Sequence, residues 1–344
     1  MVVTPCSSHA RHPLLWRRRG CARGLFAGLL IVLLSRVPAA AGIVITTSGQ
    51  GVVALSSGTT TAAELSGITF ATGTTYYAVG DDGAPAIWRL GISIDQDSGH
   101  ILSAIVSGSV HAPSLGSDSE GIAIAPGGET VWVADEVASS ITEFSLTSGE
   151  VVGGVAVPAI YAPVNVQANR GLESLSFGGG ALWTANEEAL VPDGALAEPS
   201  AGSWVRLQRF AGSALAAGGQ WAYLTDPLSG TSSFTTATRN GLVDLVALPD
   251  GGLLALERDF GGAIPSFRSR IYAVDFTGAS DVADVPTLTA GGFTPVGLGL
   301  VGVATRGRRR LKCSGASRSP MVWIGGCESE FPRRSVPRII GGGE

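Results

Sequence analysis

The chain has 344 residues, with 49 glycines and only 15% charged residues, a composition that favours short strands and tight turns over long surface helices. The whole-chain charge of −5 conceals an acidic body. Residues 1–41 carry six Arg and no acid, residues 296–344 carry nine Lys plus Arg against three Glu, and residues 42–295 therefore hold eight Arg against 25 acids, or 8 − 25 = −17. Such a body repels phosphate backbones and attracts divalent cations, which excludes nucleic acid as a partner.

The first segment of the chain has the composition of an export signal. Arginines precede ten apolar residues, Leu25–Leu34, and Ala39–Ala41 supplies small residues for cleavage. A membrane-spanning helix needs about 20 residues, so this run is too short for a stable span. We predict a signal peptide over residues 1–41 and a secreted or periplasmic protein, and an uncleaved membrane anchor is the alternative.

A strand–turn–strand pattern then recurs along the chain. Each copy has an apolar run, a turn that usually contains glycine, a second apolar run and an acidic end, and the copies cover Leu65–Asp82, Ser119–Glu136, Leu172–Glu188 and Val243–Arg258. Gly67 and Gly121 are 121 − 67 = 54 residues apart, and Gly121 and Ser174 are 174 − 121 = 53 apart, a spacing typical of β-propeller blades. We therefore predict an all-β fold, a β-propeller of about five to six blades over residues 42–295.

Other positions along the body have structural interpretations. The stretches 190–203 and 228–240 are rich in Pro, Ser, Thr and Gly, and we expect them to form loops that project from one face. Tyr77, Trp132 and Trp183 occupy matching positions in the second strand of their copies. Their expected role is packing between blades.

The last segment differs from the rest in composition. After Val296 the sequence turns to Arg, Ser and Gly, and we predict that residues 296–344 form an atypical basic tail that is disordered. Translation in a shifted frame, a genuine basic tail and a sorting signal are the open interpretations. A closing blade that is missing or altered would leave strand edges exposed and lower the stability of the propeller.

Composition limits the chemistry of the body. Residues 42–295 contain no cysteine and only two histidines, His100 and His111, which excludes a three-histidine zinc site. Neither a G-x-S-x-G sequence nor a P-loop is present. Cys313 and Cys327 lie in the tail, where a disulfide and two incidental thiols are both open. Carboxylates remain as the reactive groups.

Aligned acids indicate a metal site. When the copies are overlaid, Glu120, Glu173 and Asp244 occupy matching positions on the first strand. The first strand of each propeller blade lines the central channel, so the three carboxylates would converge and repel one another unless a cation lies between them. Hard oxygen ligands without His or Cys select Ca²⁺ or Mg²⁺, of which Ca²⁺ is favoured. A calcium site is therefore predicted, and turn caps or pairs with arginine are the structural alternative.

Several segments, taken together, resemble one family. They are SDSEGIAIAPGGETVWVADE from Ser117, RGLESLSF from Arg170, LWTANEEAL from Leu182, VRLQRF from Val205, YLTDP from Tyr223, GLVDLVALPDGGLLALERDF from Gly241 and RIYAVDF from Arg270. As a set they resemble the phytase-like family, described by the esterase-like activity of phytase, over residues 58–295. The resemblance implies a secreted bacterial β-propeller that hydrolyses phosphate or carboxylic esters with a metal ion. The sequence departs from the family pattern after Val296.

The resemblance also implies roles for particular residues. Acids recur in the family at the ends of second strands, which makes Glu187, Glu257 and Arg258 the candidates for catalysis, with one carboxylate as general base. Arg206 and Arg258 would orient a phosphate or carboxylate of the substrate. An ordinary exposed position on a strand is the alternative for Arg206.

A small-molecule ester is the expected substrate. Phytate carries many negative charges, and an acidic body would need several cations to hold it, so a smaller ester is favoured. We expect a monomer. Two other functions stay open: a non-catalytic secreted propeller that binds a protein or glycan, and a calcium-dependent lactonase-like enzyme.

Overall fold

The computed structural model describes residues 44–46, 53–55, 62, 64–81, 85–233, 235–264, 266–305 and 312–314. The predicted signal peptide and most of the predicted tail, including Cys327, lie outside these residues. The helices in this part of the chain are short 3₁₀ turns: η1 (Ala159–Tyr161), η2 (Pro163–Asn165), η3 (Val191–Asp193) and η4 (Leu288–Ala290). No helix among the described residues has the length and apolarity to cross a membrane.

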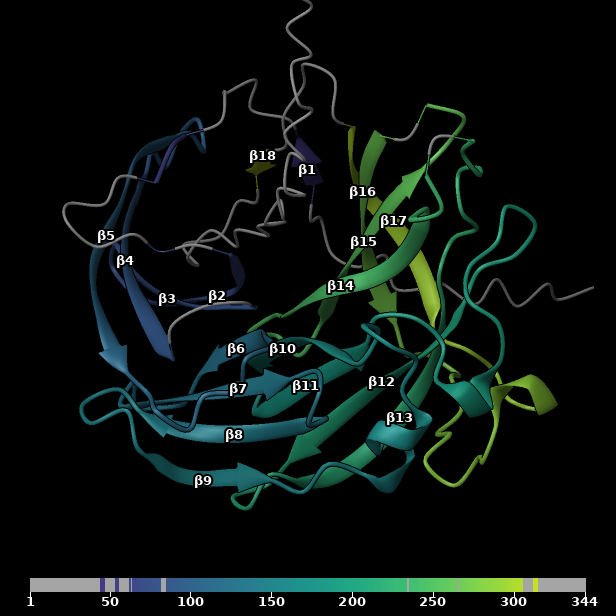
Figure 1. Cartoon of the computed structure of the whole chain (residues 1–344), viewed down its shortest axis with the longest axis horizontal. Coiled ribbons are helices and arrows are strands. Elements are labelled where there is room, and N and C mark those ends of the chain that lie inside the picture. The colour runs from purple at the N-terminus through teal and green to yellow at the C-terminus, as the bar shows by residue number, and fades with distance from the viewer. Residues whose placement is uncertain are drawn as a thin grey trace, which may run out of the picture. The chain divides into compact units, whose positions relative to one another are not determined.

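Four antiparallel sheets of four strands each follow one another along the chain (Figure 1). The first contains β2 (Leu65–Thr72), β3 (Thr75–Gly80), β4 (Ala86–Ile94) and β5 (Ile101–His111). The second contains β6 (Ser119–Ile124), β7 (Thr130–Asp135), β8 (Ser140–Ser145) and β9 (Val151–Val155).

The other two sheets repeat this arrangement. The third contains β10 (Leu172–Gly178), β11 (Ala181–Asn186), β12 (Trp204–Ala211) and β13 (Ala216–Leu224). The fourth contains β14 (Arg239–Ala247), β15 (Leu253–Gly261), β16 (Ser266–Asp275) and β17 (Gly297–Thr305). A separate pair joins β1 (Val44–Thr46) to β18 (Lys312–Ser314). In all four sheets the strands are ordered as in the chain, which is the order of propeller blades.

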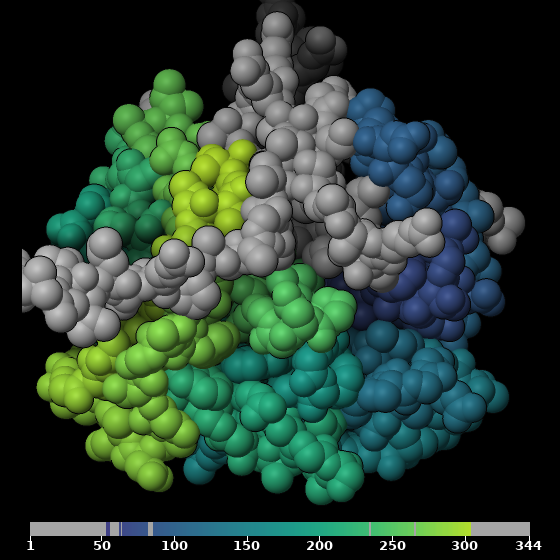
Figure 2. All heavy atoms as spheres, turned by 180° about the vertical axis from the view of Figure 1, so that it is seen from behind, coloured from purple at the N-terminus to yellow at the C-terminus, as the bar shows by residue number. Residues whose placement is uncertain are grey.

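The first strands of the sheets lie next to one another. β6 contacts β2 and β10, and β10 contacts β14 (Figure 1). The approach is close, because a Cβ on Gly67 would lie 2.4 Å from the carbonyl oxygen of Glu120, and one on Gly121 would lie 2.7 Å from the backbone nitrogen of Leu175. In the view from behind, the colours pass in chain order from each sheet to the next (Figure 2). Glycine at these two positions thus lets consecutive blades meet along their inner strands.

Aromatic residues of the second strands pack between blades, as the sequence predicts. Trp132 stacks on Phe177 of the third sheet, with ring centroids 5.5 Å apart. Trp183 lies 5.3 Å from Phe276, which follows the third strand of the fourth sheet. Tyr77 packs against an apolar cluster that includes residues of β7. These contacts bury large apolar surfaces where neighbouring sheets meet.

The described residues form four blades, and the predicted number of five to six is not confirmed. That number came from dividing the length of the body by a period of about 50 residues. Two long connections use residues that a further blade would need, one between β11 and β12 and one between β16 and β17. Among the described residues ahead of β2, only β1 is a strand.

The fourth blade extends beyond the domain end that the sequence predicts at residue 295. β17 pairs with β16 over its whole length, with Leu298 opposite Val274. The sequence analysis assigns the apolar run from Val296 to Ala304 to the basic tail. In the structure most of this run forms β17. The change in composition therefore falls after the last strand of the fourth blade.

The connection between β16 and β17, residues 276–296, crosses from the fourth sheet to the third. The backbone N–H of Val282 donates to the carbonyl of Gln220 at 2.7 Å, and that of Val296 donates to the carbonyl of Ala222 at 3.0 Å. The segment thus covers the edge of β13, which would otherwise present unpaired backbone groups. The stretch 190–203 is packed in part, because Leu190 and Asp193 are buried, and it is exposed at residues 198–201.

Candidate functional site

Backbone pairing shows which residues of the four sheets are equivalent. In each sheet the residue directly before the bulge of the inner strand pairs with a residue of the second strand: Leu65 with Gly80, Ser119 with Asp135, Leu172 with Asn186 and Leu242 with Glu257. The residues that follow these partners are therefore equivalent as well. They are Asp81, Glu136, Glu187 and Arg258, and we call this place the ring position. Three sheets have a carboxylate there, and the fourth has an arginine.

The carboxylates at the ring position have oxygens without hydrogen-bond partners. Among the described residues, Oδ1 of Asp81, Oε2 of Glu136 and both carboxylate oxygens of Glu187 are buried and accept no hydrogen bond. Glu136 is 3% exposed and Glu187 is 1% exposed. Each such oxygen carries a desolvation cost of a few kcal/mol. The same desolvation cost occurs at the ring position of three sheets, which indicates that these oxygens bind a ligand.

Glycines of the next sheet make room for two of these side chains. A Cβ on Gly171 would lie 2.8 Å from Cγ of Glu136, and a Cβ on Gly241 would lie 2.6 Å from Cγ of Glu187. The N–H of Gly171 also donates to Oε1 of Glu136 at 2.6 Å. Neither glycine has a positive φ, so space for the carboxylate is the reason for glycine at both positions.

Asp118 and Glu120 form a compact group with Glu136. One carboxylate oxygen of each lies within 4.8 Å of those of the other two. Glu120 occupies a bulge in β6, since Ser119 and Gly121 pair with β7 and Glu120 does not. Its Oε2 accepts a hydrogen bond from the hydroxyl of Ser66. Three hard oxygen donors, with Oε2 of Glu136 still unpartnered, fit a divalent cation such as Ca²⁺.

Burial favours protons on these acids when no cation neutralises them. Burial raises the pKa of Glu120 to about 7 and that of Glu136 to about 7, and the charge of Glu187 adds to both shifts. Burial also raises the pKa of Asp118, with a further contribution from Asp135. The pKa of Glu173 is raised well above its usual value, first by burial and then by the charge of Glu187. These acids share one electrostatic environment, and we call the following residues the inner acid cluster: Asp81, Asp118, Glu120, Glu136, Glu173 and Glu187.

Two arginines of the fourth sheet border the inner acid cluster. Nη2 of Arg258 lies 3.8 Å from Oε1 of Glu173 and 4.0 Å from Oε1 of Glu187. Nη1 of Arg239 lies 3.6 Å from Oε2 of Glu187. The two arginine side chains are 22% and 31% exposed, so they connect a buried carboxylate with solvent. Arg258 thus lies beside the acids, as the sequence-based assignment requires, and Arg239 is a neighbour that the sequence did not indicate.

The structure brings Glu120 and Glu173 together but not Asp244. Glu173 occupies the bulge of β10 that corresponds to the bulge of Glu120, whereas Val243 occupies it in β14. Asp244 is one residue further along, where its Oδ1 accepts the N–H of Leu245 at 2.8 Å. Burial raises the pKa of Asp244 to about 7 without a contribution from the other acids. The overlay of the copies is off by one residue here because the turns between the first two strands differ in length.

Glu257 is held in place by hydrogen bonds from its neighbours. It is fully buried, and it accepts hydrogen bonds from the hydroxyl of Tyr223 at 2.9 Å, the N–H of Asp226 at 3.0 Å and the side-chain amide of Asn240 at 2.9 Å. Arg270 lies 3.9 Å from the same carboxylate. This saturated arrangement connects the third sheet with the fourth and supports a structural role for Glu257, whose predicted catalytic role stays a prediction.

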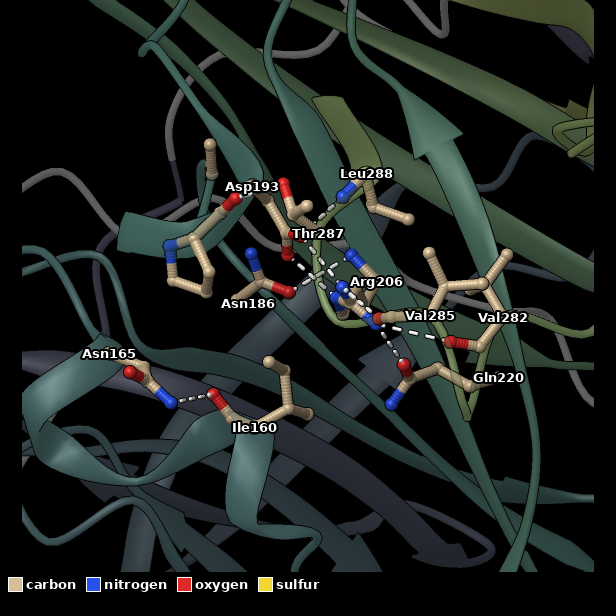
Figure 3. A network of polar contacts seen from close by, with 12 residues as sticks. Ile160, Asn165, Asn186, Asp193, Arg206, Gln220, Val282, Val285, Thr287 and Leu288 are labelled. Atoms are coloured by element: carbon tan, nitrogen blue, oxygen red, sulfur yellow. Dashed lines mark hydrogen bonds and ion pairs between the residues drawn. The ribbon is translucent and has the colours of Figure 1, made fainter. Parts of the chain in front are cut away.

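Arg206 is likewise structural rather than a substrate ligand. It is 0% exposed, so both the predicted contact with substrate and the alternative of an exposed position are contradicted. All five of its side-chain N–H groups have acceptors (Figure 3): Asp193 at 2.6 and 2.7 Å, the side chain of Gln220 at 2.7 Å, and the carbonyls of Val282 at 3.2 Å and Val285 at 2.9 Å. These hydrogen bonds hold residues 276–296 against the third sheet.

The sequence contains a signal for Asp81 and Glu136, which the sequence-based assignment missed, and the same signal indicates Glu187. Asp81, Glu136 and Glu187 each come directly after a second strand or its end, in the acidic pairs Asp81-Asp82, Asp135-Glu136 and Glu187-Glu188. Only the register shows which member of each pair is at the ring position. Asp118 directly precedes Ser119 of β6, and the equivalent residues of the third and fourth sheets are Gly171 and Gly241.

The fold and the site define a class: an all-β propeller whose inner strands carry a carboxylate site. The family described as phytase-like, with the esterase-like activity of phytase, matches residues 60–305, and the chain belongs to this family. The match reaches the end of β17, in agreement with the position of the fourth blade. No curated protein shows a significant match to the chain.

Solved structures resemble the chain only distantly. The periplasmic gluconolactonase PpgL of Pseudomonas aeruginosa is 14% identical, with a TM-score of 0.33 over 70% of this chain and 71% of that chain. A putative 6-phosphogluconolactonase of Bacteroides uniformis is 15% identical, with a TM-score of 0.32 over 70% and 71%. Hydrazine synthase of Kuenenia stuttgartiensis is 12% identical, with a TM-score of 0.33 over 61% of this chain and 62% of that chain, less than two thirds of its length. Similarity at this level carries no conclusion about activity.

Proposed function

We propose that the protein is a hydrolase of phosphate or carboxylic esters that depends on a divalent cation, with Ca²⁺ as the expected ion. The observation that supports this proposal is the group formed by Asp118, Glu120 and Glu136, whose oxygens lie within 4.8 Å of one another. The unpartnered Oε2 of Glu136 has no other use among the described residues. Asp81 contributes to the raised pKa of both Asp118 and Glu120, so a fourth carboxylate lies near this group. Ca²⁺ takes six to eight oxygen ligands, about the number that such a group and water supply.

A bound divalent cation would polarise the phosphoryl or acyl oxygen of an ester and stabilise the charge that develops on it. The chain's own residues would perform the remaining steps. Burial and the charge of Glu187 raise the pKa of Glu173 well above its usual value, and Glu173 is the candidate acid for the leaving group. Glu187, whose oxygens accept no hydrogen bond in this part of the structure, is the candidate base for water. Arg258 lies within 4.0 Å of both and would hold them in place.

Hydrolysis of an aryl phosphate and an aryl acetate, with and without chelator, tests the proposal. We expect turnover that chelator abolishes and added Ca²⁺ restores. Glu136→Gln keeps an oxygen for the N–H of Gly171 but removes the charge, and we expect it to lower turnover by about a hundredfold. Glu150→Gln, an exposed carboxylate of the same sheet, is the matched control and should behave as the wild type.

The proposal fails if chelator leaves turnover unchanged or if Glu136→Gln and Glu150→Gln have equal activity. Absence of turnover on both esters, together with equal melting temperatures with and without Ca²⁺, would favour the non-catalytic binding propeller. The melting temperature of each variant separates loss of activity from loss of folding.

We further propose that the protein acts outside the cytoplasm. The support is the arginine-rich, then apolar, then small-residue pattern of residues 1–41. Amino-terminal sequencing of protein recovered from the producing cell tests this proposal. A chain that begins near Gly42 supports export, and a chain that retains residues 1–41 in the cytoplasmic fraction contradicts it.

A further inference from the structure

We propose that Arg239 and Arg258 together bind the phosphoryl group of the substrate, so that the natural substrate is a phosphate monoester rather than a neutral carboxylic ester. The choice between these two ester classes rests on the proposed function. The binding of a phosphoryl group by the two arginines does not depend on turnover and can be tested without it.

The two arginines project from one face of neighbouring strands. Arg258 in β15 pairs directly with Gly241 in β14, and Arg239 lies two residues before Gly241 on the same strand. Side chains of directly paired residues, and of residues two apart on a strand, point to the same face. Both guanidinium groups accordingly reach Glu187, at 3.6 Å from Arg239 and 4.0 Å from Arg258. They form a pair of positive groups on either side of one carboxylate.

Both guanidinium groups have N–H donors that are available to a ligand. No side-chain hydrogen bond joins Arg239 or Arg258 to another described residue, and their ion pairs are 3.6 to 4.0 Å long, which is longer than a hydrogen bond. Glu187, their shared partner, is 1% exposed and has no hydrogen-bond donor for either oxygen. Donors that face a buried acceptor without contacting it indicate a place where a third group completes the network.

The chemistry of the pair favours a phosphoryl group. A planar guanidinium binds two oxygens of a phosphate at once, and two of them offer ten N–H donors to a group with three free oxygens. The arginines carry two positive charges, and Glu187 is the carboxylate that both of them face. A neutral ester brings no charge to the two guanidinium groups, whereas a dianionic phosphoryl group brings two negative charges to them. At 22% and 31% exposure, both side chains are accessible to a ligand from solvent.

The nearby carboxylates of the inner acid cluster would repel the same phosphoryl group. A cation held by Asp118, Glu120 and Glu136 removes that repulsion, and a bound phosphoryl group favours the cation in return. By thermodynamic linkage each ligand then raises the affinity of the other by the same factor.

Calorimetric titration of the full chain with phenylphosphonate, which carries one phosphoryl group and no ester to hydrolyse, tests the proposal. We expect binding that Ca²⁺ strengthens. Arg239→Gln and Arg258→Gln should each weaken binding by about tenfold or more, which corresponds to at least about 1.4 kcal/mol. Arg89→Gln makes the same change in charge at an exposed position of the first sheet and should bind as the wild type. Glu187→Gln should bind phenylphosphonate more tightly, because it removes the carboxylate that competes for the two arginines.

Equal affinity of Arg239→Gln, Arg258→Gln and Arg89→Gln would overturn the proposal, as would a wild type that does not bind phenylphosphonate with Ca²⁺ present. Circular dichroism and the melting temperature verify that each variant is folded. In steady state, Arg239→Gln should raise KM for an aryl phosphate and leave KM for an aryl acetate unchanged, and equal changes for both esters would contradict the assignment of substrate class. Arginine-dependent phenylphosphonate binding without any turnover would refute the proposed function but not the binding site.

Discussion

The network around Arg206 and the inner acid cluster both contain buried charged groups. They differ in whether these groups have hydrogen-bond partners. Arg206 has acceptors for all five of its side-chain N–H groups, and Asp193 also accepts the N–H of Leu288 at 2.9 Å in the network shown in Figure 3. In the inner acid cluster, oxygens of Glu136 and Glu187 accept no hydrogen bond among the described residues. A network in which every buried polar group has a partner stabilises the fold. Buried groups without partners lower the stability, and a ligand that binds them supplies the missing partners. The following predictions test this difference.

The largest effect is expected where a completed pair is broken. Asp193→Ala leaves the guanidinium of Arg206 buried without its carboxylate, which costs about 3–5 kcal/mol of unfolding free energy. Urea denaturation measures the loss. Glu150→Gln, an exposed control, should stay within about 0.5 kcal/mol of the wild type. A loss of less than about 1 kcal/mol in Asp193→Ala would contradict the structural role given to this pair.

The opposite sign is expected in the inner acid cluster. Glu136→Gln removes one of several mutually repelling carboxylates, so in chelator at about pH 8 it should raise the free energy of unfolding, by about 1–2 kcal/mol. The same variant should lose the stabilisation that Ca²⁺ gives the wild type. Thermal unfolding with chelator and with Ca²⁺ measures both effects. A variant that is destabilised in chelator and still stabilised by Ca²⁺ would show that Glu136 is a structural group.

A steric change should separate the site from the fold. In Gly241→Ala the new Cβ lies 2.6 Å from Cγ of Glu187, and displacement of this side chain should cost about 1–3 kcal/mol and most of the turnover. Gly299→Ala in β17 is the control, because its Cβ would have no neighbour nearer than 3.9 Å. Equal turnover in the two variants would mean that the position of Glu187 is unimportant for catalysis.

The last prediction concerns the pH dependence of stability without metal. The pKa values of Glu120 and Glu136 are raised from 4.5 in the unfolded chain to about 7 in the fold. Their contribution to stability is therefore complete below pH 4.5 and is lost as the pH rises through about 7, because the unfolded chain releases these protons first. Melting temperatures in chelator should fall by several degrees over this range, and Ca²⁺ should remove the decline. A melting temperature in chelator that rises with pH would contradict the assigned protonation.

Much of the fold could be predicted from the sequence, because the strand–turn–strand period and the alignment of second strands depend on local patterns. Trp132 and Trp183 pack as that alignment requires. The number of blades could not be predicted, because long connections such as residues 276–296 add to the length of the chain without forming a further blade. Most of this connection lies against the third sheet rather than the fourth, which precedes it in the chain.

The site was predicted only in part, for two physical reasons. The turns between the first two strands differ in length, so the overlay misses that Val243 rather than Asp244 occupies the bulge that matches Glu120 and Glu173. The burial of Arg206 depends on carbonyls 76 and 79 residues away in the chain, at Val282 and Val285, and no local pattern indicates them. Glu187 and Arg258 were found because acids at strand ends are visible in the sequence.

The central claim is that the inner acid cluster exchanges protons for a divalent cation. Calorimetric titration of metal-free protein with Ca²⁺, repeated near pH 6.5 in two buffers of different ionisation enthalpy, measures the number of protons released on binding. Because Glu120 and Glu136 have pKa values of about 7, we predict saturable binding that releases about one to two protons per ion. Absence of Ca²⁺ binding, or binding whose heat is the same in both buffers, would contradict the account.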